Sequence, residues 1–317
     1  MKFNSLQFIK NFSAIYHRQG KQETKAARYL INLLRQHDVH FHVEPFITYI
    51  PKFISAILTA DGKKIPATAN SLVSGKITGK YNMASSLIPS RRFTKEANLI
   101  TFNPYCHARS QANYYYVPSV TVEPKYLKYI FAGKNIKGEV KVKTLRYISK
   151  NILVGNTVDP KTIIFAHYDS IGPGALDDAS GIALLLKMIT AYPETTADTL
   201  YIFAGNEELS YDRPIYWGHG YRAFEKKHKD ILEKCEQIIC VDCVGASKPM
   251  LYRDKKTVKQ GLPLANLDRW LPKTSMLACE YDTVMKIYHS DLDTWRKVKP
   301  KYLNECLGFL KKLIKTT

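Results

Sequence analysis

The chain has 317 residues, of which 45% are hydrophobic, which is ample for a large core in one big domain or in two smaller ones. No run of 18 or more apolar residues occurs, so no transmembrane helix is expected. The first twenty residues have the apolar spacing of a helix face rather than the apolar core of a signal peptide. A cytoplasmic protein is therefore expected.

The net charge of +19 is concentrated in one part of the chain. Residues 47 to 150 contain 17 Lys or Arg and 4 Asp or Glu, against 30 and 24 in the remainder. The same stretch holds the aromatic cluster Tyr114, Tyr115 and Tyr116, and basic residues among aromatics can bind nucleic acid. Because no recognised nucleic-acid motif accompanies the charge, we expect a solvated basic face and no specific nucleic-acid partner.

Two helices are predicted at the start of the chain. The first has Phe8, Ile9 and Phe12 on one face, and the second spans roughly Glu23 to Gln36. From about residue 47 to 150 the chain breaks into short β-type segments separated by turn residues, such as SLVSGKITGKY and NYYYVPSVTVE. Long helical periodicity is nearly absent there, so this stretch is predicted to be an inserted β-rich subdomain.

Beyond residue 150, apolar strands alternate with amphipathic helices. The predicted strands are NILVG, TIIFA, TLYIFAG and QIICV, and the predicted helices cover about 180–192, 220–234 and 301–315. This alternation is typical of a doubly wound α/β domain.

Three of these strands end in residues that can bind a metal or move a proton. TIIFA runs into His167 and Asp169, TLYIFAG into Glu207 and Glu208, and QIICV into Asp242. Each alone is as easily explained as a turn or capping residue. In open α/β sheets the functional crevice lies beyond the carboxyl ends of the strands, so we expect the three endings to converge.

Two further segments add candidates. GPGALDDASG contains Asp177, its glycines suit a tight turn, and Asp178 or Ser180 is expected to cap the helix that follows. Near the C-terminus, IYHSDLDT places His289 in a loop. A single loop histidine is usually only solvated, but this one adds a second imidazole to the candidate ligands.

The combined set of two imidazoles and several carboxylates suits zinc, with manganese or cobalt as substitutes. Five ligands are too many for one catalytic zinc but fit two ions if one carboxylate bridges them. Glu207 and Glu208 point apart in an extended segment, so one can bind metal while the other acts as a general base. Asp169 lies two residues past His167 and is placed to hydrogen-bond its second ring nitrogen.

The six cysteines are expected to be free thiols, because disulfide frameworks belong to small secreted chains. Cys240 and Cys243 form a C-x-x-C pair inside IICVDCVG. No second pair and no paired histidines complete a structural zinc set, so both are predicted to be buried residues of a strand.

The segments AHYDS, GALDDASG, FAGNEEL, VDCVG and YHSDLDT together resemble the dizinc exopeptidases of the bacterial leucyl aminopeptidase type. Relatives of that family include glutamate carboxypeptidase, glutaminyl cyclase and the transferrin receptor. The resemblance implies a doubly wound mixed sheet of the phosphorylase/hydrolase-like zinc exopeptidase type. It also implies a catalytic domain of residues 1–46 and 147–317, with 47–146 as an inserted basic, β-rich subdomain, either protease-associated-like or a lid.

The resemblance further implies a role for each candidate residue. Asp177 would bridge two zinc ions, His167 and Asp242 would complete one site, and Glu208 and His289 the other. Glu207 would be the general base that takes a proton from the water between the ions and passes it to the leaving amine. Asp169 would orient His167, and Tyr288 would hydrogen-bond the tetrahedral intermediate. His219, in the longer segment after the glutamates, is expected to be exposed and not a ligand.

The activity implied is that of an aminopeptidase acting on peptides. Three alternatives stay open: a carboxypeptidase or dipeptidase for acidic substrates, suggested by the basic insertion; a glutaminyl cyclase, which keeps one zinc; and a binding or scaffold protein on a degenerate peptidase fold. The sequence leaves open the side-chain specificity, the role of the insertion and the oligomeric state.

Overall fold

The computed structural model describes residues 3–78, 82–93 and 97–315, and the chain divides into two compact units. Unit 1 comprises Met1–Thr48, Arg146–Val284 and Asp293–Thr317, and unit 2 comprises Tyr49–Leu145 and Met285–Leu292. The sequence had suggested borders at 46/47 and 146/147. The segment 285–292, expected within the catalytic domain, groups here with unit 2.

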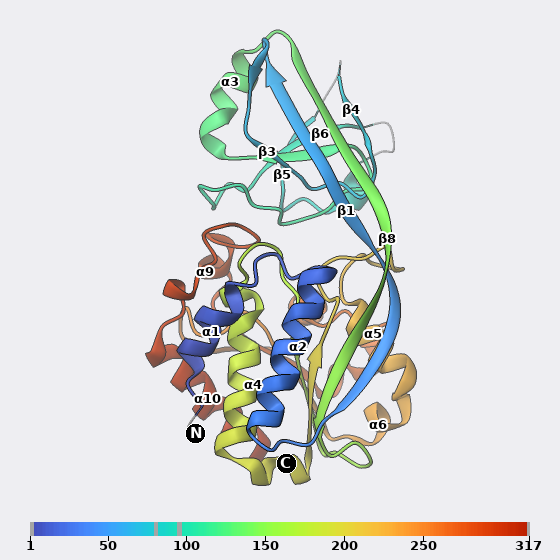
Figure 1. The fold of residues 1–317 in the computed structure, drawn as a ribbon, viewed down its shortest axis with the longest axis vertical. Coiled ribbons are helices and arrows are strands. Elements are labelled where there is room, and N and C mark those ends of the chain that lie inside the picture. Colours follow the sequence, from blue (N-terminus) through green and yellow to red (C-terminus); the bar gives the residue numbers. More distant parts are fainter. Residues whose placement is uncertain (1–2, 79–81, 94–96, 316–317) are drawn as a thin grey trace. The chain divides into compact units, whose positions relative to one another are not determined.

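Unit 1 is built on a mixed sheet, as predicted for an α/β protein (Figure 1). Its strands are β9 (Thr162–His167), β10 (Thr199–Ala204), β11 (Gln237–Val241), β12 (Met250–Tyr252) and β13 (Thr274–Ala278), with parts of β1 (His42–Ala60) and β8 (Ile136–Gly155). The order is β12-β13-β11-β9-β10-β8-β1. The four central strands are parallel, whereas β8 and β12 pair antiparallel at either side of them.

Helices cover both faces of this sheet. They are α1 (Ser5–Ser13), α2 (Lys21–Gln36), α4 (Ser180–Ala191), α5 (His219–Lys227), α6 (Lys229–Lys234), α7 (Lys255–Gly261), α8 (Leu267–Trp270), α9 (Tyr281–Met285) and α10 (Pro300–Lys315). On one face α4 packs on β9 and contacts α1 and α10. On the other, side chains of α5 to α8 join those of β9, β10 and β11 in one buried cluster that includes Phe165, Phe224 and Trp270.

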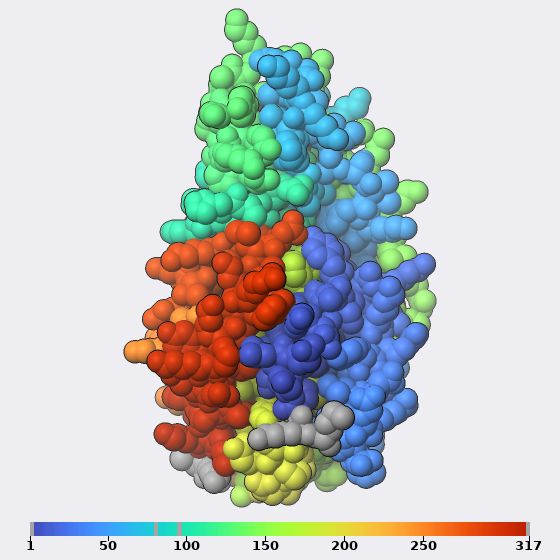
Figure 2. Space-filling model, turned by 60° about the vertical axis from the view of Figure 1, so that its left-hand side comes forward, coloured from blue at the N-terminus to red at the C-terminus, as the bar shows by residue number. Residues whose placement is uncertain are grey.

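The predicted single helix over 220–234 is instead two helices, α5 and α6, that meet at His228. The opening helices and the helix at the C-terminus lie where the sequence predicted them. Figure 2 shows the N-terminal segment of unit 1, in dark blue, against the red C-terminal segment, where α1 contacts the 3₁₀ turn Trp295–Lys297. Within the ranges that the structure describes, no helix has the length and apolarity needed to cross a bilayer.

Unit 2 is β-rich, and its described residues include the short helix α3 (Leu127–Ala132). Its own strands are β2 (Lys63–Lys64), β3 (Ala67–Ala69), β4 (Gly75–Ile77), β5 (Asn82–Ser85), β6 (Leu99–Phe102) and β7 (Ser119–Val122). Four of them form a second sheet in the order β3-β7-β6-β5, and β4 pairs with β8. Its apolar core gathers Leu58, Ile100, Val120 and Ile130 from four different elements.

Candidate metal centre

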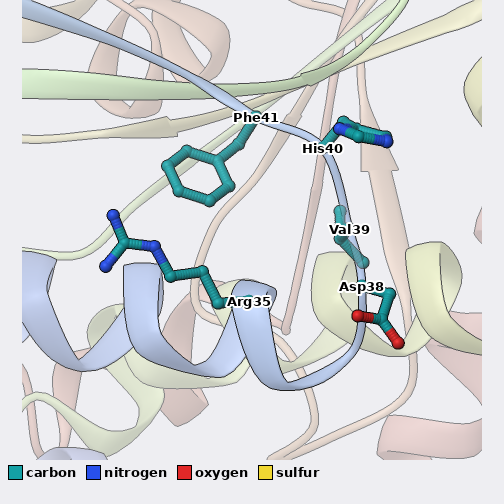
Figure 3. Close-up of a pocket in the computed structure, with 5 residues that line it drawn as sticks. All are labelled: Arg35, Asp38, Val39, His40 and Phe41. Carbon is teal, nitrogen blue, oxygen red and sulfur yellow. The ribbon is translucent and has the colours of Figure 1, made fainter.

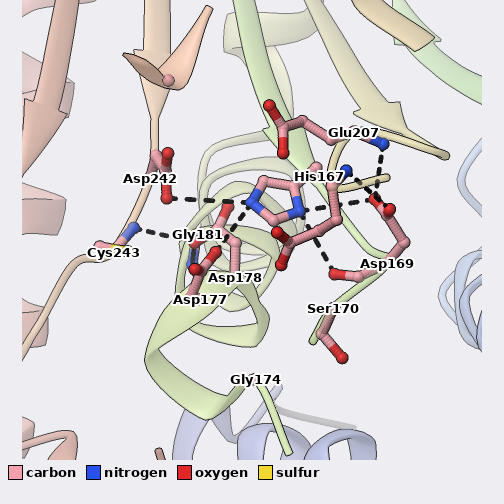
Figure 4. Close-up of polar contacts among 12 residues, drawn as sticks. His167, Asp169, Ser170, Gly174, Asp177, Asp178, Gly181, Glu207, Asp242 and Cys243 are labelled. Carbon is pink, nitrogen blue, oxygen red and sulfur yellow. Dashed lines mark hydrogen bonds and ion pairs between the residues drawn. The ribbon is translucent and has the colours of Figure 1, made fainter. Parts of the chain in front are cut away.

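β9 carries the first predicted ligand to its end. All six of its residues are buried, and His167 is only 1% exposed. The ring Nδ1 lies 3.2 Å from the backbone oxygen of Asp169 and 3.5 Å from the Asp169 carboxylate. When Nδ1 carries the proton and donates toward Asp169, Nε2 keeps its lone pair for a metal ion. Figure 4 shows Nε2 directed at the carboxylates of Asp177 and Asp242.

The turn between β9 and α4 presents Asp177 to the imidazole. Asp293 fixes this turn, because its carboxylate accepts the amides of Leu176 and Asp177 at 2.7 and 3.1 Å. Asp178 accepts the amide of Gly181 at 2.9 Å and so satisfies a donor in the first turn of α4. The carboxylate of Asp177 is thereby left to face Nε2 of His167, 3.0 Å away.

Asp169 also organises the glutamate pair that follows β10. Its two carboxylate oxygens accept the backbone amides of Glu207 and Glu208 at 2.9 and 3.0 Å. Gly205 lets this loop approach closely, because a Cβ there would lie 2.5 Å from the hydroxyls of both Ser149 and Tyr168. One buried carboxylate therefore sets the position of the imidazole and of both glutamates.

Among the described residues of unit 1, three groups of side chains have donor atoms within 4.8 Å of one another, as ligands of one metal ion require. They are His167, Asp177 and Glu208; His167, Asp178 and Asp242; and Asp177, Asp242 and Cys243. The structure thus brings together four of the five predicted ligands: His167, Asp177, Glu208 and Asp242. Asp177 shares one group with Glu208 and another with Asp242, as a carboxylate that bridges two ions would.

The arrangement fits zinc. Two ligands at 2.0–2.1 Å from a tetrahedral zinc ion are about 3.3 Å apart, and Nε2 of His167 lies 3.0 Å from Asp177 and 3.9 Å from Asp242. Within the described ranges, Oδ1 of Asp242 and Oδ2 of Asp178 are buried without a hydrogen-bond donor. A buried carboxylate oxygen without a donor is costly, and a bound cation would satisfy both.

The pKa shifts of the residues in the site also favour a bound cation. Burial raises the pKa of Glu207 well above its usual range, His167 opposes this, and Glu208 adds to it. Burial alone would lower the pKa of His167, but the nearby carboxylates of Asp169, Asp177 and Asp242 raise it overall. The cluster thus carries an excess of negative charge that attracts either protons or a cation. Burial also raises the pKa of Asp293 to about 7, while the amide of Leu176 opposes it.

A segment just before α2 supports the site, and the sequence reasoning did not identify it. Arg18 is fully buried and donates to the backbone oxygens of Tyr168, Pro173 and Gly174 at 2.7 to 2.8 Å. The next residue, Gln19, donates to the Asp169 carboxylate at 3.0 Å. A signal was present in the sequence, because HRQGKQE places six polar or charged side chains where a helix begins, but the burial of these side chains is not visible in sequence.

Replacing Arg18 with Met is expected to lower the free energy of unfolding by about 3 to 5 kcal/mol, since three buried carbonyls lose a charged donor. Urea unfolding of the metal-free protein, followed by circular dichroism, measures the change. Arg28→Met, an exposed position on α2, is the matched control and should change stability by less than about 0.5 kcal/mol. A loss below about 1 kcal/mol for Arg18→Met would mean that Arg18 does not hold the loop.

The fifth predicted ligand, His289, and its neighbour Tyr288 belong to unit 2. There Nδ1 of His289 lies 3.1 Å from the backbone oxygen of Gln111, and the rings of Tyr288 and His289 stack with their centroids 3.8 Å apart.

His219 was expected to be exposed, and this prediction is wrong. It is half-buried at the start of α5, and its Nδ1 lies 3.0 Å from the Thr48 hydroxyl, because the segment after the glutamates folds back on β1.

A separate hollow of about 370 Å³ lies where α2 runs into β1, lined by Arg35, Asp38, Val39, His40 and Phe41 (Figure 3). The figure shows His40 and Asp38 pointing away from Arg35, so the polar groups of the hollow do not converge on one point as in a ligand site.

The six cysteines are all buried and free. Cys240 lies in β11 as predicted, whereas Cys243 lies beyond its end.

The part of the chain that holds this centre is similar to a known protein family. Peptidase family M28 matches residues 151–266, a range that contains Asp169, Asp177, Glu207 and Asp242, together with His167 and Glu208. No curated protein matches the chain in sequence.

Solved structures share its fold. The zinc aminopeptidase BSAP from Bacillus subtilis is 16% identical with a TM-score of 0.69, covering 96% of this chain and 92% of that chain. A peptidase M28 precursor from Shewanella amazonensis is 15% identical with a TM-score of 0.70, covering 98% and 92%. A glutaminyl cyclase from Fimbriiglobus ruber is 9% identical with a TM-score of 0.55, covering 100% and 97%. Residues 151–266, which hold the metal-compatible cluster, therefore resemble the peptidase domain of family M28.

Proposed function

We propose that this chain is a zinc-dependent aminopeptidase that removes N-terminal residues from peptides. The observation that carries the proposal is the buried group of His167, Asp177 and Glu208 within the range that matches peptidase family M28. The fold shared with BSAP, a zinc aminopeptidase, supports cleavage from the N-terminus rather than from the C-terminus.

Two zinc ions per chain are part of the proposal. Asp177 would bridge them, His167 and Asp242 would complete one site, and Glu208 and His289 would complete the other. The recurrence of Asp177 in two ligand groups supports the bridge. When bound, the ions would polarise the scissile carbonyl and make the attacking water easier to deprotonate.

The remaining residues bind, orient and move protons. Glu207 is buried, its amide is held by Asp169, and Figure 4 shows its carboxylate beside the His167 ring. It accepts the proton of the attacking water and returns it to the leaving amine. Asp169 keeps His167 in the tautomer with a free Nε2. Tyr288 donates a hydrogen bond to the oxygen that becomes negative at the tetrahedral stage.

The experiment is a substrate panel run on protein of known metal content. We expect about two zinc ions per chain by elemental analysis and turnover of several aminoacyl-aminocoumarins. A chelator should abolish turnover, zinc should restore it, and N-acetylated versions of the same substrates should resist. Zinc-loaded protein that cleaves none of a broad panel would contradict the proposal.

A second candidate is glutaminyl cyclase, favoured by the fold shared with the Fimbriiglobus ruber enzyme. Incubation with a peptide that begins with glutamine separates the two activities. Cyclisation would release ammonia and leave a peptide of the same length with pyroglutamate at its N-terminus. An aminopeptidase would instead release free glutamine. The basic stretch of unit 2 suggests the other alternative, a carboxypeptidase for acidic peptides, and C-terminal trimming in the same assay would reveal it.

A further inference from the structure

Cys243 follows Asp242 directly, beyond the end of β11, and the ligand set proposed above does not use its thiol. The side chain is 5% exposed, and the residue has a φ of 54°, in the left-handed region that cysteine rarely adopts. Its backbone is fixed on both sides, because its amide donates to Asp178 at 3.3 Å and its carbonyl accepts from Cys279 at 2.9 Å. The direction of its Cα–Cβ bond is therefore set by the fold.

The sulfur lies among potential metal ligands. Within the described part of the chain, Cys243 is the only cysteine in a ligand group, and its partners are Asp177 and Asp242, all within 4.8 Å. A tetrahedral zinc ion with bonds of 2.0 Å to oxygen and 2.3 Å to sulfur separates those two atoms by about 3.5 Å. Because the three donor atoms lie within 4.8 Å of one another, side-chain shifts of little more than about 1 Å bring all three to one ion.

A second observation points to a cation at the same place. Asp178, whose carboxylate holds the Cys243 amide, is fully buried, and its Oδ2 accepts no hydrogen bond from the described residues. Oδ1 of Asp242 is likewise buried and accepts no hydrogen bond from the described residues. Two buried carboxylate oxygens without donors therefore flank the residue whose thiol completes the group.

We propose that Cys243 provides a thiolate ligand to the ion held by His167, Asp177 and Asp242. The sulfur–metal bond forms as the S–H bond breaks, the proton passes to solvent, and no atom changes oxidation state. One sulfur ligand shifts the preference of this site toward zinc, cadmium and cobalt and away from manganese and magnesium. The inference rests on the proposed metal site but not on the reaction catalysed there.

X-ray absorption at the zinc edge, on the full chain loaded with zinc, tests this directly. We expect a sulfur shell at about 2.3 Å with an average of about half a sulfur per zinc, because one of two ions carries the thiolate. Cys243→Ser should lose this shell and keep the nitrogen and oxygen shells. Cys235→Ser, which removes another buried free thiol of unit 1, is the matched control and should keep it.

Metal titrations give a second readout that needs no catalysis. Cys243→Ser is expected to weaken cadmium binding at least about tenfold and to change manganese binding much less. Bound zinc with only nitrogen and oxygen neighbours in the unsubstituted protein would overturn the role of Cys243 and leave the proposed metal site intact. Failure of the protein to bind zinc at all would overturn both.

Discussion

Glu207→Gln is expected to lower turnover by at least about a hundredfold while zinc content and fold stay unchanged. Glutamine keeps the shape of the side chain but cannot accept a proton from water. The backbone amide at this position would still donate to Asp169, so the loop after β10 should not move. Steady-state kinetics, elemental analysis and circular dichroism on the same preparation check the three parts of the prediction.

The adjacent glutamate is the matched control. Glu208→Gln makes the same chemical change one residue later, and its amide is held by the same Asp169 carboxylate. Because Glu208 shares a ligand group with His167 and Asp177, its substitution is expected to lower bound zinc, which Glu207→Gln should not do. Near-normal turnover in Glu207→Gln, or loss of zinc from it, would remove Glu207 from the role of base.

Much of the fold of unit 1 was predictable because apolar periodicity carries it. The runs TIIFA, TLYIFAG and QIICV became β9, β10 and β11, which are buried almost throughout. The sequence also predicted that polar residues after these strands would converge, since parallel strands present their carboxyl ends at one edge. The neighbouring β12 and β13 were not predicted, because β12 has only three residues and TSMLA in β13 lacks the run of β-branched residues that marks QIICV.

Other features of unit 1 could not be predicted, because they depend on tertiary contacts that the sequence pattern does not show. The break between α5 and α6 at His228 falls inside a continuous amphipathic pattern. Arg18 looks like an ordinary charged residue before a helix, yet it is fully buried with three carbonyl partners. Cys243 was expected to be a buried residue of a strand, but it lies beyond the end of β11, where its sulfur comes within reach of Asp177 and Asp242.

A bound metal ion would account for the gathering of several buried carboxylates around the His167 imidazole. Buried carboxylates repel one another, and in the metal-free protein this repulsion raises the pKa of Glu207 and of Asp178 beyond the effect of burial. The fold holds them in place through Asp169, Asp293 and Arg18, none of which is a proposed ligand. Metal binding is therefore expected to stabilise the folded chain, because it removes a repulsion that the fold alone must otherwise sustain.

Asp177 is the residue on which both proposed ions depend, so Asp177→Asn is expected to reduce bound zinc from about two per chain to well below one. An amide oxygen is a weaker, neutral ligand and cannot bridge two cations as a carboxylate does. The turn itself should persist, because Asp293 binds the backbone amide of this residue and not its side chain. Activity should become undetectable while the circular dichroism spectrum stays that of the parent protein.

Asp242→Asn separates a bridge from a single-site ligand. Asp242 shares ligand groups with His167, Asp177, Asp178 and Cys243 but not with Glu208, so its substitution should empty one site and leave about one zinc per chain. Elemental analysis of the two variants after identical dialysis gives the comparison. If Asp177→Asn retained as much zinc as Asp242→Asn, Asp177 would not bridge the two ions. Each ion would then be held by its own ligand group without depending on Asp177.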